Sequence, residues 1–99
     1  MPTYVTLTRF TDKGVETIKD GPARLDAAKK AYRDLGAEIK AFYLVTGEYD
    51  AVLISEAPDD ETIAKLALGI RAWGTSRSET LRAFTEEEYR KLVAELPER

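Results

Sequence analysis

The chain contains no cysteine and no histidine among its 99 residues, and these two absences exclude most of the common catalytic centres. Without cysteine there is no disulfide, thiol nucleophile, iron–sulfur cluster or structural zinc site of the usual kind. Without histidine there is no Ser–His dyad, no imidazole metal ligand and no proximal haem ligand. Any chemistry must therefore rest on carboxylates, phenols, hydroxyls, lysines and arginines.

Basic charge and long apolar runs are also scarce. The chain has 15 basic and 18 acidic residues, and no basic run is longer than two. Nucleic-acid binding needs clustered Lys and Arg, so we expect no nucleic-acid partner. The longest apolar stretch, residues 65–73, is interrupted by Gly69 and Arg71 and is shorter than the ~20 residues that span a bilayer. Because no leader-like segment precedes the first strand, we expect no membrane contact and a cytoplasmic location.

Length and composition describe an ordinary globular chain. Hydrophobic residues make up 43% and charged residues 33% of the sequence. A chain of this size buries roughly 65% of its surface on folding, which is enough for one modest core. We therefore expect residues 1–99 to form a single domain.

Four strand-like segments alternate with helical ones. Runs rich in β-branched and aromatic residues predict strands at residues 3–10, 38–45, 49–55 and 76–84. Apolar stripes at helical spacing predict one helix from Gly21 to Gly36 and another from Pro58 to Gly74. Thr85 and the glutamates after it match a capping box, so a third helix precedes Pro97.

The resulting order is β-α-β-β-α-β followed by an extra C-terminal helix. Two strand–helix–strand halves joined by a hairpin are typical of the α+β ferredoxin-like split βαβ sandwich. Right-handed crossovers place the first and third strands at the centre of a four-stranded antiparallel sheet. Both of the first two helices then pack on one face of that sheet.

The other face of the sheet also needs cover, because the hairpin is apolar on both sides. Strict alternation places Phe42 and Leu44 opposite Ile39, Tyr43 and Val45. It likewise sets Tyr49, Ala51 and Leu53 against Asp50, Val52 and Ile54. The third helix could cover this face, but a homodimer that packs two sheets together is favoured. Tyr4, Thr6 and Thr8 would then line a half-polar cavity between the two sheets.

The hairpin and its flanks carry a family resemblance. The motif Gly47-Glu48-Tyr49-Asp50, the start Tyr4 to Gly14 and the segment Thr80 to Thr85 resemble the GYD-domain family. The resemblance spans nearly the whole chain and implies a ferredoxin-like subunit similar to the dimeric α/β-barrel superfamily. It implies no catalytic residues, because the family's role is largely uncharacterised. The wider superfamily includes monooxygenases and ligand-sensing regulator domains, so function does not follow from fold.

Asp50, Tyr43 and Tyr49 are the candidate catalytic residues. A buried Asp50 could act as an acid–base group, and either phenol could assist it. The alternative is structural: Asp50 accepts hydrogen bonds from turn amides or pairs with an arginine, and Tyr49 only packs. We expect the structural role for Asp50, because strands are depleted in aspartate and a buried carboxylate needs compensation.

A second set of side chains could bind a ligand. Aromatic residues could line an apolar cavity, although such residues are more often core or interface. Arginines 24, 71, 77 and 82 could also gather around an anion. The candidate ligand-binding residues are Tyr4, Phe42, Tyr43, Tyr49, Trp73 and Arg77.

Two acidic clusters and one long connection complete the candidates. Residues 59–61 and 86–88 each stand where a helix begins, and the helix dipole accounts for them without a metal. No calcium, phosphate or dinucleotide loop is present, so we expect neither metal nor cofactor. The connection 11–21 is either a lid over a cavity or a helical turn that seals the core edge.

These observations favour a binding or assembly module over an enzyme. The leading hypothesis is a cytoplasmic homo-oligomer whose subunits enclose a small, partly aromatic cavity for a small molecule. One alternative is a cofactor-independent enzyme, similar to a monooxygenase or isomerase, that uses Asp50, Tyr43 or Tyr49. Another is a ligand-sensing regulatory subunit that acts through a separate output protein.

Overall fold

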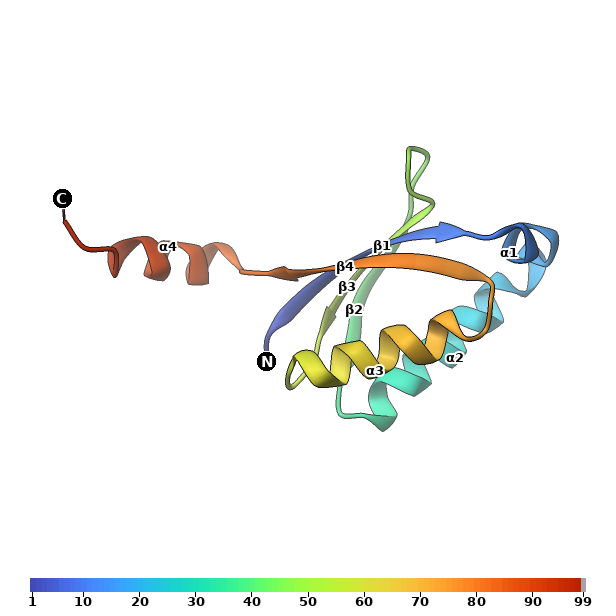
Figure 1. Cartoon of the computed structure of the whole chain (residues 1–99), viewed down its shortest axis with the longest axis horizontal. Helices are drawn as coiled ribbons and strands as arrows, with labels where there is room; N and C mark the ends of the chain where they lie inside the picture. Colours follow the sequence, from blue (N-terminus) through green and yellow to red (C-terminus); the bar gives the residue numbers. More distant parts are fainter. Residues whose placement is uncertain (99) are drawn as a thin grey trace.

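The computed structural model describes residues 1–98, and its elements follow the predicted order (Figure 1). Each predicted strand and each of the three predicted helices is present, and two short helical pieces occupy the connection 11–21. The elements are β1 (Thr3–Phe10), α1 (Asp12–Glu16), the 3-10 helix η1 (Ile18–Asp20), α2 (Gly21–Asp34), β2 (Glu38–Leu44), β3 (Ala51–Glu56), α3 (Asp60–Arg71), β4 (Ser76–Ala83) and α4 (Glu86–Ala94).

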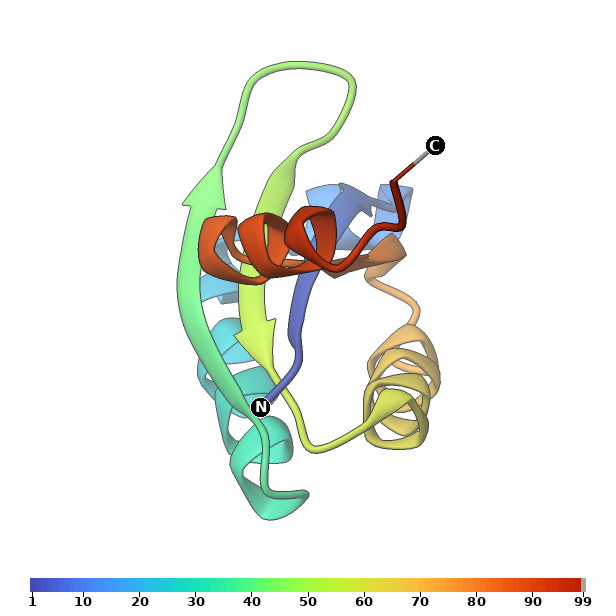
Figure 2. The same ribbon diagram turned by 90° about the vertical axis from the view of Figure 1, so that its left-hand side faces the viewer.

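The four strands form one sheet in the order β2-β3-β1-β4, and every neighbouring pair is antiparallel. This confirms the α+β ferredoxin-like fold with β1 and β3 at the centre. Helices α2 and α3 lie on one face, α2 toward the β2 edge and α3 toward the β4 edge (Figure 2). We call the covered side the helix-side face and the opposite side the outer face.

Local signals in the sequence place the helix ends. Pro22 stands in the first turn of α2, where its missing N–H costs nothing. Gly36 and Gly74 follow α2 and α3 with φ of 77° and 78°, the left-handed region that favours glycine. The Asp59 carboxylate caps α3 by accepting from the Thr62 amide at 2.8 Å.

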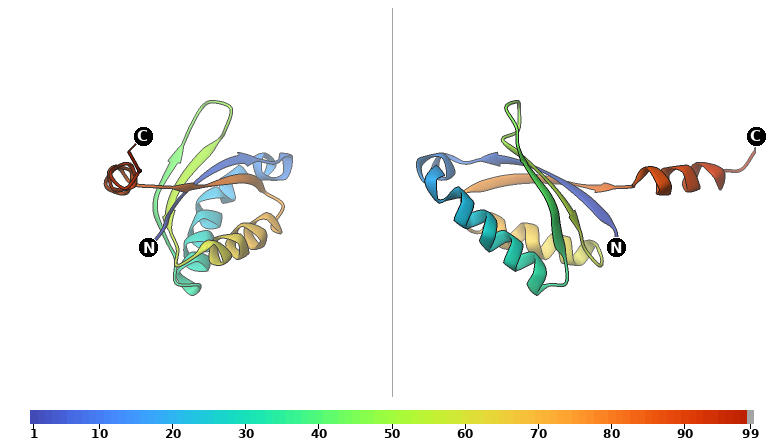
Figure 3. Two further views of the ribbon diagram at one scale, coloured as in Figure 1. Left: turned by 60° about the vertical axis from the view of Figure 1, so that its left-hand side comes forward. Right: turned by 180° about the vertical axis from the view of Figure 1, so that it is seen from behind.

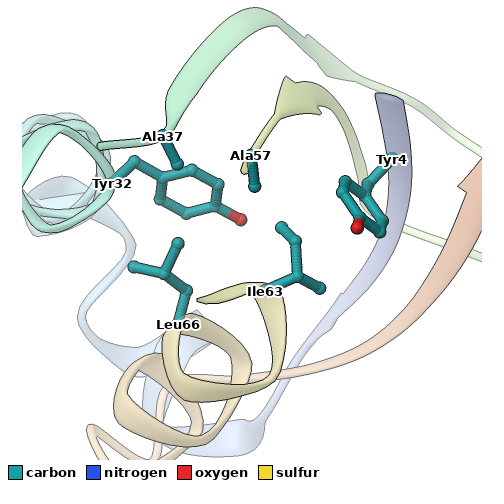
Figure 4. Close-up of a cluster of buried hydrophobic side chains, with 6 residues drawn as sticks. All are labelled: Tyr4, Tyr32, Ala37, Ala57, Ile63 and Leu66. Carbon is teal, nitrogen blue, oxygen red and sulfur yellow. The ribbon is translucent and has the colours of Figure 1, made fainter. Parts of the chain in front are cut away.

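The buried core lies between α2, α3 and the strands (Figure 4). Two of its members are tyrosines, so the core contains hydroxyl groups. Tyr4 is only 2% exposed, and its hydroxyl donates to Asp60 at 2.5 Å. Burial, together with this hydrogen bond, raises the pKa of Tyr4 to about 12. The cluster consists of Tyr4, Tyr32, Ala37, Ala57, Ile63 and Leu66.

The expected cavity between two sheets does not use the residues predicted for it. Tyr4, Thr6 and Thr8 are all buried on the helix-side face, while the residues between them are half-buried on the outer face. These three side chains are therefore covered by the chain's own helices. The prediction that they face a second sheet is wrong.

A β-bulge at Lys40 changes the face assignment on β2. Ile39 pairs with Ser55, and the next paired residue, Ala41, lies opposite Ile54. The extra residue shifts the alternation by one. Ile39 therefore lies on the helix-side face with Phe42, and the prediction that these two point in opposite directions is wrong.

The hairpin connection is longer than predicted. β2 ends at Leu44 and β3 begins at Ala51, so Tyr49 and Asp50 precede the strand. Their side chains are consequently not bound by strand alternation, and the prediction that Tyr49 shares a face with Ala51 is wrong.

Helix α4 does not cover the chain's own sheet. It extends beyond the end of β4, away from the rest of the molecule (Figures 1 and 3). It contains no buried residue, and its apolar side chains Tyr89, Leu92 and Val93 are 62%, 50% and 48% exposed. The outer face is therefore left without an intrachain partner from this helix.

Candidate functional site

A cavity of about 420 Å³ lies between the helix-side face and helices α2 and α3. Its sheet wall is formed largely by small hydroxyl side chains, because β1 and β4 both place serine or threonine at alternate positions. These hydroxyls are those of Thr6, Thr8, Ser76, Ser78 and Thr80.

The other walls of the cavity are apolar. The helices and the β2–β3 half of the sheet contribute aliphatic and aromatic side chains at the spacing that faces the sheet. This combination suits a mainly apolar molecule with few polar groups. The principal apolar lining residues are Leu25, Ala28, Phe42, Leu53, Ile63, Ala67, Ile70 and Trp73.

Tyr32 links the cavity to the core. Its side chain lines the cavity, and its hydroxyl points into the buried cluster (Figure 4). Burial raises the pKa of Tyr32, while the neighbouring hydroxyls of Ser55 and Thr6 lower it. Ser55 is fully buried, and its Oγ has no partner within hydrogen-bond geometry among residues 1–98. The deep end of the cavity therefore borders on a group of hydroxyls.

Arg24 stands at the opposite end of the cavity. Its guanidinium donates to the Thr17 carbonyl at 3.1 Å, the Thr17 Oγ1 at 3.0 Å and the Gly14 carbonyl at 3.3 Å. These contacts tie α2 to the connection between β1 and α2. Arg24 therefore holds this connection and also lines the cavity.

The connection 11–21 corresponds to the second of its two predicted alternatives, a helical turn that seals the core edge. The Thr11 hydroxyl donates to the Gly74 carbonyl at 2.7 Å, and the Thr11 amide donates to the Thr75 carbonyl at 3.1 Å. Gly14 is so close to the same strand entrance that a Cβ there would lie 2.2 Å from the Thr75 carbonyl oxygen. Ile18 completes the cavity wall.

The motif at residues 47–50 is divided between two roles. Asp50 accepts a hydrogen bond from the Phe10 amide at 2.8 Å, and its own amide donates to the Thr8 carbonyl at 2.8 Å. Its carboxylate is used to extend the β1–β3 pairing, as the structural alternative predicts, although through a strand amide rather than a turn amide.

Tyr49 belongs to a polar group on the outer face. Its hydroxyl donates to Glu79 at 2.8 Å, and the Arg9 guanidinium lies 4.7 Å from its ring centre. Arg9 also pairs with Glu48 at 2.7 Å. The hydrogen bond to Glu48, followed by that to Tyr49, raises the pKa of Arg9.

The predicted site residues do not come together in one place. Phe42 and Trp73 line the cavity, and Tyr4 lies in the adjoining core. Tyr43 and Arg77 lie on the outer face, opposite in strand alternation to lining residues. The alternating hydroxyls of β4 lie on the same strand as Arg77, and this pattern could have pointed to the cavity wall.

The predicted anion site and metal alternatives receive separate explanations. Arg77 and Arg82 stand on opposite faces of β4, and Arg82 lies over the rings of Tyr4 and Phe84. The amide of Thr62 lowers the pKa of Asp59 in its capping role. Among residues 1–98, no group of three acidic side chains is placed to hold a metal ion. No helix in that range is long and apolar enough to cross a membrane.

Comparison with known proteins identifies the family. A model described as GYD domain matches residues 4–93. The chain belongs to the GYD-domain family. One curated relative, from Thermus thermophilus, is named "Glutamine synthetase and cystathionine beta-lyase binding protein". It is 37% identical over 85 residues, which cover 85% of this chain and 90% of the relative.

Solved structures support the fold. A crystal structure of another Thermus thermophilus protein chain is 29% identical with a TM-score of 0.55, covering 86% of this chain and 95% of that one. The leucine response regulatory protein of Mycobacterium tuberculosis is 18% identical with a TM-score of 0.63. The match covers 85% of this chain but 51% of the regulator, so this chain spans about half of that protein. At this identity the likeness concerns the ferredoxin-like fold alone.

Proposed function

We propose that this GYD-domain protein is a small-molecule-binding module whose ligand occupies the cavity between the sheet and helices α2 and α3. The observation that carries this proposal is the cavity of about 420 Å³ with apolar walls. Protein interiors are normally close-packed, so a cavity of this size deprives its lining side chains of contacts. An apolar ligand restores those contacts and shields the lining from water.

Binding is favoured over catalysis because the candidate acid–base groups lie outside the cavity. Asp50 accepts from the Phe10 amide, Tyr49 donates to Glu79, and Tyr43 is 60% exposed on the outer face. A general acid or base must come within hydrogen-bond reach of the substrate. None of these three residues lines the cavity.

The binding proposal can be tested with decanol as an apolar probe. Trp73 is the chain's only tryptophan and lines the cavity, so its fluorescence reports on occupancy. We expect a saturable change with decanol. Ala67→Phe fills the cavity and should abolish the change, whereas Ala64→Phe, an exposed position on the same helix, should not. No saturable change in the parent protein, or equal losses in both variants, would contradict the proposal.

We also propose that the module is a homodimer, because two apolar surfaces have no partner within the described chain. On the outer face, Val5 pairs with Leu81 and Ile54, and Leu7 pairs with Val52, which produces a continuous apolar patch. Leu81 is 44% exposed, and the apolar side of α4 is exposed as well. A second copy offers the same two surfaces and could cover both by a two-fold arrangement.

Light scattering distinguishes this assembly from a monomer. We expect a mass twice the 11.1 kDa of one chain. Leu81→Lys places a charge on the outer face and should shift the protein toward the monomer. Leu68→Lys is the matched control, because Leu68 is 71% exposed on α3 and lies away from the outer face. A parent protein that stays monomeric at micromolar concentration would refute the dimer.

The relative's name motivates a test for a protein partner. We propose that this chain, too, binds glutamine synthetase or cystathionine beta-lyase, and that the ligand in the cavity adjusts this binding. Immobilised chain exposed to each purified enzyme should give saturable binding whose affinity changes with decanol. The absence of binding to both enzymes would leave the cavity proposal standing and would reject this partner assignment. The cytoplasmic location stays a prediction.

A further inference from the structure

A second, more open hollow adjoins the apolar cavity at the start of α2. The two hollows share Arg24, Trp73 and Thr75, and the outer one is also bordered by Lys13 and Asp20. The guanidinium of Arg24 therefore stands where the apolar interior gives way to a polar mouth. A ligand that enters from this end passes between Arg24 and the indole of Trp73.

The charges at this mouth are unbalanced. Arg24 donates only to the uncharged oxygens of Thr17 and Gly14, and Lys13 donates only to the Trp73 carbonyl, at 3.4 Å. Among residues 1–98, neither cation lies within ion-pair distance of a carboxylate. Of the described residues that border the hollow, Asp20 alone is acidic, so two cations face one carboxylate.

The Arg24 guanidinium is both fixed and available. Its contacts with Thr17 and Gly14 hold it in place and use at most three of the five N–H donors that an arginine carries. A cation that is held in place before binding loses little conformational freedom when an anion arrives. Charge-assisted hydrogen bonds from such a group to a carboxylate are stronger than bonds between neutral groups.

We infer that the ligand of this cavity is an apolar monocarboxylic acid. Its hydrocarbon body occupies the cavity, and its carboxylate binds Arg24 at the mouth with Lys13 nearby. This inference rests on the proposed small-molecule-binding function and adds the chemical class of the ligand. The hydroxyls of the sheet wall remain available for a single polar substituent along the ligand's body.

The test compares three probes with the same ten-carbon tail: decanoate, decanol and decylamine. Each is titrated into the full chain while Trp73 fluorescence is recorded. We expect decanoate to bind roughly tenfold more tightly than decanol, since a hydrogen bond to a charged group contributes about 1.5–3 kcal/mol and 1.4 kcal/mol corresponds to tenfold. Decylamine should bind most weakly of the three.

Two variants assign this preference to the mouth. Arg24→Gln should remove the preference for decanoate while decanol affinity is retained, and Arg33→Gln, near the other end of α2, should leave both affinities unchanged. Because Arg24 also holds the connection 11–21, Lys13→Gln provides a second test and should weaken decanoate binding but not decanol binding. Equal affinities for decanoate and decanol in the parent protein would overturn the inference and leave the proposed function intact. If neither probe binds, the proposed function itself fails.

Discussion

The carboxylate of Asp50 completes the hydrogen bonding of Phe10, the last residue of β1. The Phe10 amide donates to Asp50 Oδ2 at 2.8 Å, and the Asp50 amide donates to the Thr8 carbonyl at 2.8 Å. Asp50 thus continues the β1–β3 pairing by one step beyond Ala51, using its side chain where a strand would use a backbone carbonyl. The aspartate of the GYD-type motif is in this way a structural residue of the sheet.

Substitution of Asp50 should therefore lower stability. Asp50→Ala leaves the partly buried Phe10 amide without an acceptor, and we expect the free energy of unfolding to fall by about 1–3 kcal/mol. Asp50→Asn keeps an acceptor oxygen and should recover much of this loss. Urea denaturation of the three proteins gives the comparison. Identical midpoints for Asp50→Ala and the parent would show that the Phe10 contact does not stabilise the fold.

Much of the fold follows from local sequence signals, and the departures have identifiable causes. Gly36, Pro22 and the Thr85 capping box each determine a helix end through their own backbone chemistry, so these ends are predictable from sequence. The bulge at Lys40 depends on which residues of β2 and β3 pair, and alternation alone cannot reveal that register.

The candidate site was less predictable than the fold. Phe42 and Trp73 are recognisable as aromatic lining candidates, but whether a strand residue faces the helices or the outer side depends on tertiary packing. The exposed position of α4 is a tertiary property as well, since its stripe of apolar residues is the same whether or not it covers the sheet. Arg24 lies beside the cavity because η1 and α1 fold against the α3–β4 connection, which no local pattern encodes.

Two glycines should respond in opposite ways to alanine. In Gly14→Ala the new Cβ would lie 2.2 Å from the Thr75 carbonyl oxygen, so α1 or β4 must shift. We expect a loss of about 1–3 kcal/mol in the free energy of unfolding. Gly69 lies inside α3 with nothing within 4 Å of a Cβ, so Gly69→Ala should gain roughly 1 kcal/mol. Thermal and urea denaturation measure both changes, and a stable Gly14→Ala protein would contradict the tight contact with Thr75.

Ser55 offers a stabilising substitution. Its Oγ is fully buried without a hydrogen-bond partner among residues 1–98, and such a group loses its hydration without compensation. Ser55→Ala should therefore raise the free energy of unfolding by about 1 kcal/mol. Ser78→Ala is the control, because Ser78 is exposed and should change stability by less than about 0.5 kcal/mol. A clear loss of stability in Ser55→Ala would show that the hydroxyl has a partner in solution.

The hydroxyl of Tyr4 should make the fold sensitive to alkaline pH. Its pKa is about 12 in the folded protein, against 10.0 for the unperturbed group, because burial and the hydrogen bond to Asp60 favour the protonated phenol. Between these two values the folded state holds more protons than the unfolded chain, so the free energy of unfolding falls as pH rises. The contribution is complete below pH 10.0 and is lost as pH rises through about 12.

Tyr4→Phe removes this titration, so its urea midpoint should depend less on pH between 10.0 and about 12 than that of the parent. Tyr89→Phe is the matched control, since Tyr89 is 62% exposed on α4 and should leave the parent's slope unchanged. The loss of the Asp60 hydrogen bond lowers the midpoint of Tyr4→Phe at every pH, and for that reason the slopes are compared rather than the midpoints. If the parent and Tyr4→Phe share one slope, ionisation of Tyr4 is not coupled to unfolding and its hydroxyl is solvated in the folded state.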